Sequence, residues 1–223
     1  MKKIVTLVLI AASLFIVNPI YATATYKRWQ TINVPNVCTF QIPPTMEIQA
    51  GSYKAMMDSL NTDFGWGKNE MVAQQKGLNN MEKKAQALYA RVIVNANPID
   101  SDSNSLRLGD TLQFSKSDLM EIERILKDVL VEGFRLQKQK TGETIRLVNW
   151  RGTKVVSINN IDCVLTTYTR QLENNPIVVV YAYAFFNNTV TNNVTISYRE
   201  KDKSIWETDL NQKIIKTFNF VKH

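Results

Sequence analysis

Residues 153–198 read TKVVSI-NN-IDCVLTTYTRQL-ENNP-IVVVYAYAFF-NNT-VTNNVTISY, and this stretch decides the fold. Its four long runs are rich in Val, Ile, Thr, Tyr and Phe, the residues that pack well in β-strands. The breaks between them carry Asn pairs, which tolerate the left-handed backbone conformations that tight hairpins require. The pattern therefore predicts a four-stranded antiparallel meander. Its third strand begins with an apolar run, Ile177–Val180, so we expect both faces of that strand to be covered.

Two helical patterns flank this meander. Ser115, with Asp118 three residues later, forms a capping pattern at the start of a long helix. A second helix is expected over Ile205–Thr217. At helical spacing, the apolar face of the first helix comprises Leu119, Ile122, Leu126, Val129, Gly133 and Leu136, widened by Ile125, Leu130 and Phe134. The face of the second comprises Trp206, Leu210, Ile214 and Phe218.

Shorter strand patterns occupy the first third of the chain, at Tyr26–Val34, Val37–Ile42, Met46–Gln49, Glu70–Lys76 and Ala87–Ala96. No internal repeat or linker divides the sequence, so we predict one domain over residues 25–223. The predicted fold class is α+β: an antiparallel sheet with helices packed on both faces, which is an α/β/α sandwich.

The core pattern also resembles a known family. It opens with Phe-x-Ile-Pro (Phe40, Ile42, Pro43), continues with a meander entered through the turn Asn159-Asn160-Ile161, and closes with Trp206, Leu210, Ile214, Ile215 and Phe218 on one helix. Together these features resemble the PsbP-like proteins, which are α/β/α sandwiches. The family turn often carries Gly, where this chain has Asn160, a residue that also adopts left-handed conformations. Members include an oxygen-evolving-complex subunit and a Ran-binding nuclear-transport protein, but a shared fold does not transfer such roles.

The first 24 residues have the composition of a secretory signal peptide. Met1-Lys2-Lys3 is basic, Ile4–Val17 is apolar, and Ala22-Thr23-Ala24 supplies small residues for cleavage. This apolar run is shorter than the ~20 residues of a typical membrane-spanning helix. We therefore predict a signal peptide at residues 1–24, no membrane span, and a mature chain that is periplasmic or secreted.

The charge of the chain is modestly basic. The net charge is +7 for the whole sequence, and removal of Lys2 and Lys3 with the signal peptide lowers it to +5. The remaining basic residues are scattered and accompany no nucleic-acid-binding motif. We predict a solvated basic surface and no nucleic-acid partner; contact with anionic envelope components is the alternative.

The chain has two cysteines, Cys38 and Cys163, and each alternates with apolar residues in a strand pattern. Export permits a disulfide between them, and their spacing alone does not decide whether it forms. A bridge requires Cα atoms closer than ~7 Å, and nothing in the sequence demands that these two strands be neighbours. We therefore predict two buried thiols.

The residues present exclude several kinds of catalytic site. The only histidine is His223, so triads, dyads and metal clusters that depend on histidine lack their parts. The sequence contains no phosphate loop, no dinucleotide fingerprint and no Ser-x-x-Lys motif, and no cofactor is predicted. Two hypotheses remain: a non-catalytic exported module that binds an envelope protein or a small ligand through its loops, and a histidine-independent enzyme, of hydrolytic type, on an unknown substrate.

Two sets of residues are candidate binding sites. Asp100, Asp102 and Asn104 place oxygen ligands at alternate positions, as a Ca²⁺ loop does, but the Gly and Glu expected next are Ser105 and Thr111. A plain hydrated loop is therefore the alternative for this segment.

The second set contains two tryptophans. Trp66 and Trp150 are expected at or beside Gly-containing loops, and Arg151 follows the second of them. Aromatic and arginine side chains are frequent interface anchors, so Trp66, Trp150 and Arg151 form a candidate docking patch. The alternative is that both tryptophans fold back over the edge of the sheet.

Overall fold

The computed structural model describes residues 28–51, 54–55, 58–59, 71–98 and 106–222. The chain forms two compact units, and each is described by itself. The meander unit comprises Ala96–Thr195. The terminal unit comprises the described residues up to Asn95 together with Ile196–Val221.

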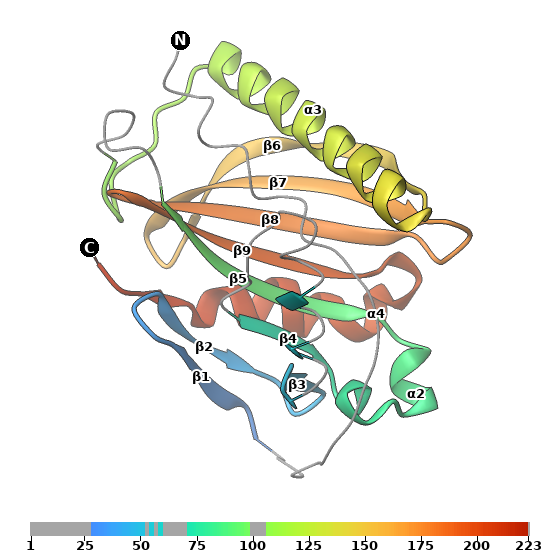
Figure 1. Ribbon diagram of the computed structural model, residues 1–223. Coiled ribbons are helices and arrows are strands. Elements are labelled where there is room, and N and C mark those ends of the chain that lie inside the picture. The colour runs from blue at the N-terminus through green and yellow to red at the C-terminus, as the bar shows by residue number, and fades with distance from the viewer. Residues whose placement is uncertain (1–27, 52–53, 56–57, 60–70, 99–105, 223) are drawn as a thin grey trace. The chain divides into compact units, whose positions relative to one another are not determined.

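The meander unit contains the four strands that the sequence predicts (Figure 1). They are β6 (Ile145–Ile158), β7 (Ile161–Leu172), β8 (Val178–Asn187) and β9 (Val190–Arg199), whose last residues pass into the terminal unit. The strands lie in the order β9-β8-β7-β6, and β7 pairs antiparallel with both β6 and β8. The antiparallel meander is therefore confirmed.

The turns and burial of the meander agree with its sequence pattern. Asn159 and Asn160 have φ angles of 53° and 62°, and they join β6 to β7 in a two-residue hairpin. Asn160 thus adopts the left-handed conformation for which glycine is the usual residue. Val178, Val179 and Val180 are all buried. Because successive side chains of a strand point to opposite faces, β8 is covered on both faces, as expected.

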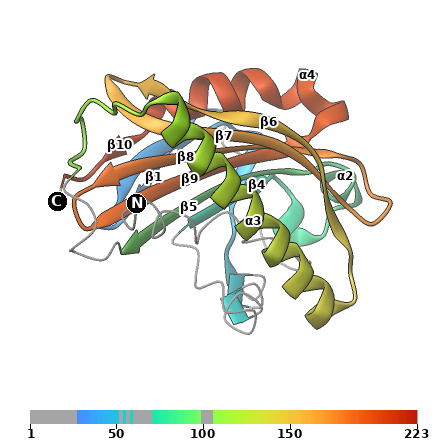
Figure 2. The same cartoon turned by 90° about the horizontal axis from the view of Figure 1, so that it is seen from above.

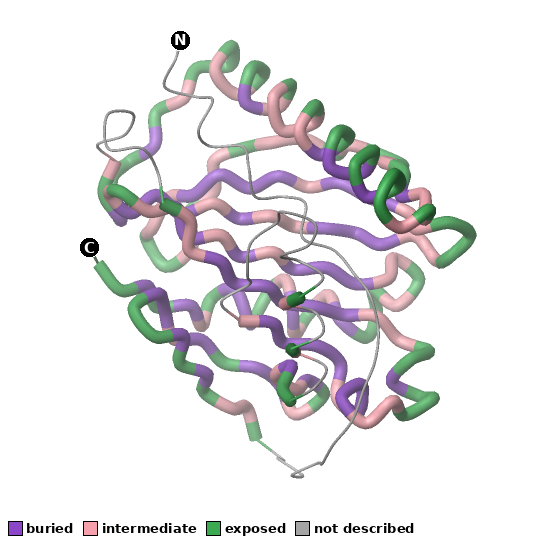
Figure 3. The backbone as a smooth tube through the Cα atoms, in the orientation of Figure 1, coloured by how far each residue is buried: buried purple, intermediate pink, exposed green. Residues whose placement is uncertain are grey.

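One long helix, α3 (Lys116–Thr141), belongs to the meander unit and contacts β6. Ser115 caps it through a reciprocal capping box with Asp118, and Gly142 ends it at a φ of 77°. Figures 1 and 2 show α3 crossing the strands of this unit, and Figure 3 shows buried and exposed segments alternating along it. Its buried residues are Ile122, Leu130, Gly133, Phe134 and Gln137. The expected place of Leu136 on this face is wrong, because its side chain is 40% exposed.

The terminal unit contains short antiparallel strands. One sheet has the order β1-β2-β10, from β1 (Gln30–Val34), β2 (Cys38–Ile42) and β10 (Asn219–Phe220). A second group has the order β3-β4-β5, from β3 (Met46–Ile48), β4 (Met71–Gln75) and β5 (Ala90–Pro98). The β4–β5 connection contains the short helices η2 (Leu78–Asn80) and α2 (Lys83–Gln86).

The last helical segment also belongs to the terminal unit. It begins after η3 (Glu200–Asp202) with α4 (Lys203–Trp206), widens into the π-helical turn η4 (Glu207–Lys213), and tightens into η5 (Ile214–Thr217). On an α-helix, each side chain is rotated by about 40° around the helix axis from the side chain four residues before it. On a wider helical turn the rotation has the opposite sense. The change of pitch therefore keeps one line of side chains inward. That line is Trp206, Leu210, Ile214 and Phe218, all buried, which confirms the predicted face.

The core of the terminal unit includes a row of stacked aromatic rings. Phe40 of β2 stacks on Phe218 with ring centroids 4.6 Å apart and an interplanar angle of 4°. Phe218 in turn stacks on Phe220 at 5.7 Å. This contact joins the opening Phe-x-Ile-Pro strand to the end of the closing helix, so the two ends of the sequence pattern meet in one core.

Both cysteines are buried and unbridged, which confirms the prediction of two thiols. Burial raises the pKa of the Cys38 thiol from its ordinary value of 9.0 to about 12. The pKa of Cys163 is also raised to about 12, first by burial and then by the neighbouring charge of Asp162. The folded state therefore favours the protonated thiols, and this contribution to stability is present below about pH 9 and is lost as the pH rises towards 12.

We expect thiol counting to show this burial. Native protein at pH 8 should react negligibly with a disulfide reagent such as Ellman's reagent, because the reactive thiolate is scarce and inaccessible. Protein unfolded in urea without reductant should release two equivalents of thiol. An unfolded chain that releases none would mean that Cys38 and Cys163 are bridged.

Candidate functional site

The candidate site lies on β6, the strand at the end of the strand order among the described residues. Its register against β7 is interrupted twice, between Leu147 and Asn149 and between Trp150 and Gly152. The pairing thus skips Val148 and Arg151, and only Asn149 and Trp150 pair with β7 between the two β-bulges. Bulges bend a strand and re-aim its side chains, and they are frequent at sheet edges and beside functional sites.

Trp150 lies inside this strand, so its expected position at a loop is wrong. Gly152 follows it at a φ of 112°, a conformation that strongly favours glycine. The sequence VNWRG therefore carries a glycine that serves a bulge within a strand rather than a loop between strands.

The indole of Trp150 is held between two side chains. It stacks on Tyr168 of β7 with ring centroids 5.8 Å apart and an interplanar angle of 9°. From α3, Lys127 Nζ lies 5.1 Å from the indole centroid, within the range of a cation–π contact. The same ammonium donates to Glu123 Oε1 at 3.0 Å. Trp150 is thus half-buried in a clamp that joins α3 to the sheet.

The two skipped residues face solvent beside this clamp. The Val148 side chain is 43% exposed, and Arg151 is exposed. Further along β6, Arg146 Nε donates to Gln171 Oε1 at 3.1 Å, and Lys154 is exposed. The strand therefore carries three basic side chains and no acidic one, which gives this edge of the meander unit a positive charge.

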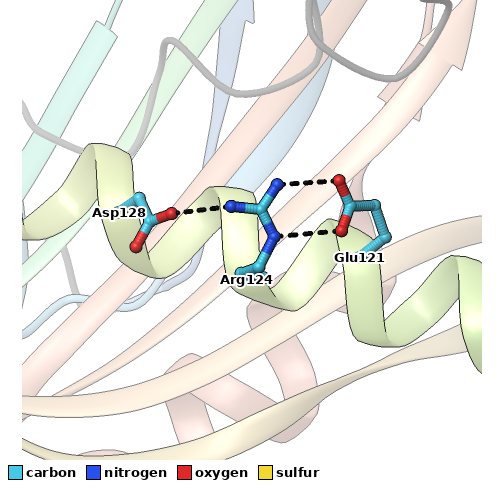
Figure 4. A network of polar contacts seen from close by, with 3 residues as sticks. All are labelled: Glu121, Arg124 and Asp128. Carbon is cyan, nitrogen blue, oxygen red and sulfur yellow. Dashed lines mark hydrogen bonds and ion pairs between the residues drawn. The ribbon is translucent and has the colours of Figure 1, made fainter. Parts of the chain in front are cut away.

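The outer face of α3 carries charge of a different kind. Arg124 donates through Nε and Nη2 to the two carboxylate oxygens of Glu121 at 3.0 and 2.8 Å, and through Nη1 to Asp128 at 3.1 Å (Figure 4). The hydrogen bonds that Arg124 donates to Glu121 lower the pKa of the Glu121 carboxyl and raise the pKa of the Arg124 guanidinium. Such exposed i,i+3 and i,i+4 pairs stabilise a helix only slightly. This face therefore carries paired charges of both signs, whereas the charged residues of β6 are all basic.

The remaining predicted site residues cannot be placed beside the clamp. Trp66, Asp100, Asp102 and Asn104 lie outside the described residues. Within the described ranges, no cluster of three or more acidic, cysteine or histidine side chains could hold a metal ion. None of the helices in those ranges is both long and apolar enough to cross a membrane.

Sequence reasoning missed three members of the site. The sequence analysis places Tyr168 only within a predicted strand and gives Lys127 and Val148 no role in a site. The hydrophobic pattern contains no signal for Lys127, because its aliphatic stem and ammonium cover an aromatic face that only the packed structure brings near.

Comparisons with known proteins return matches only among solved structures. No family model matches the chain, and no curated protein sequence matches it. Among solved structures, the chain is similar to cyanobacterial PsbP from Synechocystis, with a TM-score of 0.47 and 11% identity over 90% of this chain and 97% of that chain. It also matches a protein of Bacteroides thetaiotaomicron, with a TM-score of 0.39 and 7% identity over 83% of this chain and 46% of that one. The first of these structures is a PsbP protein, the kind of protein that the core pattern resembles.

Proposed function

We propose that this chain is an exported, non-catalytic module that binds a protein or a small ligand, with Trp66, Trp150 and Arg151 at the contact surface. The observation that carries the proposal is the double bulge of β6, which sets an exposed Arg151 beside a rigidly held Trp150. Arginine and tryptophan are over-represented among the residues that dominate binding energies. A bulge is also a common device for turning such a side chain outward.

The two residues would contribute differently to binding. Trp150 is fixed between Tyr168 and Lys127, so it acts as a preorganised support rather than as a side chain that moves to meet a ligand. Arg151 lies at the skipped position and reaches solvent. Because an ordered platform loses little conformational entropy on binding, an arginine mounted on it makes an efficient anchor.

The cellular setting belongs to the same proposal. Residues 1–24 act as a cleaved signal peptide, and residues 25–223 form one PsbP-like domain, with helices on both faces of its sheet, in the periplasm or outside the cell. The basic start and apolar core of the first 24 residues support the export step. The restriction of histidine to His223 supports a non-catalytic role.

The test uses mature protein isolated from its native host. Mass spectrometry should place its N-terminus at or within a few residues of Thr25. Tryptophan fluorescence should then show saturable quenching by a fraction of the host envelope extract, with the quenching component recovered chemically unchanged. Arg151→Ala should weaken that quenching by roughly tenfold or more, as expected for an interface arginine.

The matched control is Arg124→Ala, which removes another exposed arginine from the same unit. It should leave the quenching curve unchanged within experimental error. An intact Met1 in the folded fraction would contradict export. Equal effects of the two substitutions, or conversion of the ligand to a product, would contradict the binding proposal.

A further inference from the structure

The two halves of β6 differ in regularity. The first half contains both bulges, whereas every residue from Gly152 to Ile158 pairs with β7 in unbroken register, from Gly152 opposite Thr167 to Ile158 opposite Ile161. The bulged half is unsuited to further pairing, because skipped residues disrupt a ladder of backbone hydrogen bonds. The regular half keeps the geometry of an ordinary strand over seven residues.

This regular half lies at the end of the strand order of the described residues. One edge of such a strand pairs with its neighbour, while alternate N–H and C=O groups along the other edge point away from the sheet. An extended peptide that lies against that edge gains main-chain hydrogen bonds, and its alternate side chains meet the flanking surface. Seven residues are about as long as a typical strand, so the edge is long enough for such an addition.

The basic residues of β6 decide between two possible occupants of this edge, a second copy of the strand and an acidic peptide. Lys154 projects from the middle of the regular half, and Arg151 lies directly before it, while β6 contains no Asp or Glu. A second copy of the same strand would bring further basic side chains to this edge, and like charges directly opposite each other destabilise a cross-strand pair. An acidic strand would instead place a carboxylate opposite Lys154 and bring its end near Arg151, and opposite-charge pairs stabilise a ladder.

We propose that the outer edge of Gly152–Ile158 takes up an acidic, extended peptide segment of a partner protein as an added β-strand. The inference deepens the proposed binding function, on which it rests, by assigning the partner's chemistry and its mode of contact. Arg151 then belongs to both surfaces: it is the anchor of the docking patch and the first basic residue along the added strand.

The experiment uses three synthetic octapeptides labelled with fluorescein. One alternates glutamate with valine, the second has the same side chains with every backbone nitrogen methylated, and the third alternates lysine with valine. Fluorescence anisotropy with mature protein should show binding of the first peptide, weakened by salt. The N-methylated and the lysine peptides should bind at least roughly tenfold more weakly, because one lacks backbone donors and the other has the wrong charge.

Protein variants and amide exchange locate the contact. Lys154→Glu should weaken binding of the glutamate peptide by roughly tenfold, whereas Lys201→Glu makes the same charge change at an exposed position of the terminal unit and should alter it less than about twofold. Hydrogen exchange should slow on peptide addition within residues 152–158. The peptide comparison on wild-type protein stays decisive even if a variant folds poorly.

Three outcomes overturn the inference. Equal binding of the glutamate and N-methylated peptides would show plain ionic attraction without strand addition. Dimerisation with slowed exchange in residues 152–158 in the absence of peptide would assign the edge to a second copy. Failure of all three peptides, with the Arg151-dependent quenching by envelope extract intact, would reject the added strand while leaving the proposed function standing.

Discussion

Replacement of Phe40 by alanine is expected to lower the free energy of unfolding by about 3–5 kcal/mol. Phe40 is 1% exposed, and its ring stacks almost parallel on Phe218, which in turn stacks on Phe220. The substitution removes the buried ring, leaves a cavity, and breaks the row of stacked aromatics, a contact worth about 1 kcal/mol beyond the buried area. Urea unfolding, followed by the fluorescence of the chain's tryptophans, measures the change.

Ile205→Ala is the matched control in the same unit. Ile205 is 51% exposed on α4, one residue before the buried Trp206. Its truncation should change the free energy of unfolding by no more than about 0.5 kcal/mol, as usual for surface positions. Similar small losses at Phe40 and Ile205 would mean that β2 does not pack on the end of the closing helix.

The strands of the meander were predictable because their ends are marked locally. Asn159-Asn160 separates two β-branched runs, and the predicted second strand, Ile161–Leu172, has the same bounds as β7. Each end depends on a turn residue whose backbone preference acts on a few neighbouring positions. Such short-range effects can be read from a sequence without knowledge of the packed structure.

The first meander strand was predicted too short for a physical reason. The sequence pattern starts this strand at Thr153, whereas β6 begins at Ile145 and runs to Ile158. Gly152 has a positive φ, and a positive φ serves a turn as well as a bulge. Only the register against β7 distinguishes the two, and that register is a long-range property. The same ambiguity misplaced Trp150, the central residue of the candidate site.

The buried face of α3 was predicted only in part. Ile122, Leu130, Gly133 and Phe134 were expected to be buried and are, but Gln137 is buried and Leu136 is exposed. A hydrophobic pattern assigns an inward direction by residue type, so it selects Leu136 over Gln137. In the structure, packing of the preceding turns sets which face of the helix points inward. Gln137 lies on that face because it follows Gly133 and Phe134 at helical spacing. Charged and amide members of a site are missed for the same reason.

Leu130→Ala is expected to lower the free energy of unfolding by about 2–5 kcal/mol. Leu130 lies in the middle of α3 and is 1% exposed, so its truncation leaves a cavity in the core of the meander unit. Alanine has the highest helix propensity of the common residues, so the loss reports on packing alone. Unfolding in urea, followed by far-UV circular dichroism, gives the stability. The fluorescence of Trp150 provides a second signal, because Lys127 of the same helix lies over its ring.

The adjacent residue supplies the control that makes this result decisive. Val131 is 51% exposed, and Val131→Ala removes two methyl groups from solvent-facing helix surface. Because alanine is a better helix former than valine, this variant should be neutral or more stable by a few tenths of a kcal/mol. The two substitutions are therefore expected to differ in sign or in size by several-fold. Equal, small effects at both positions would show that α3 does not pack Leu130 into the core, and the clamp that Lys127 makes over Trp150 would then have no packed helix to hold it.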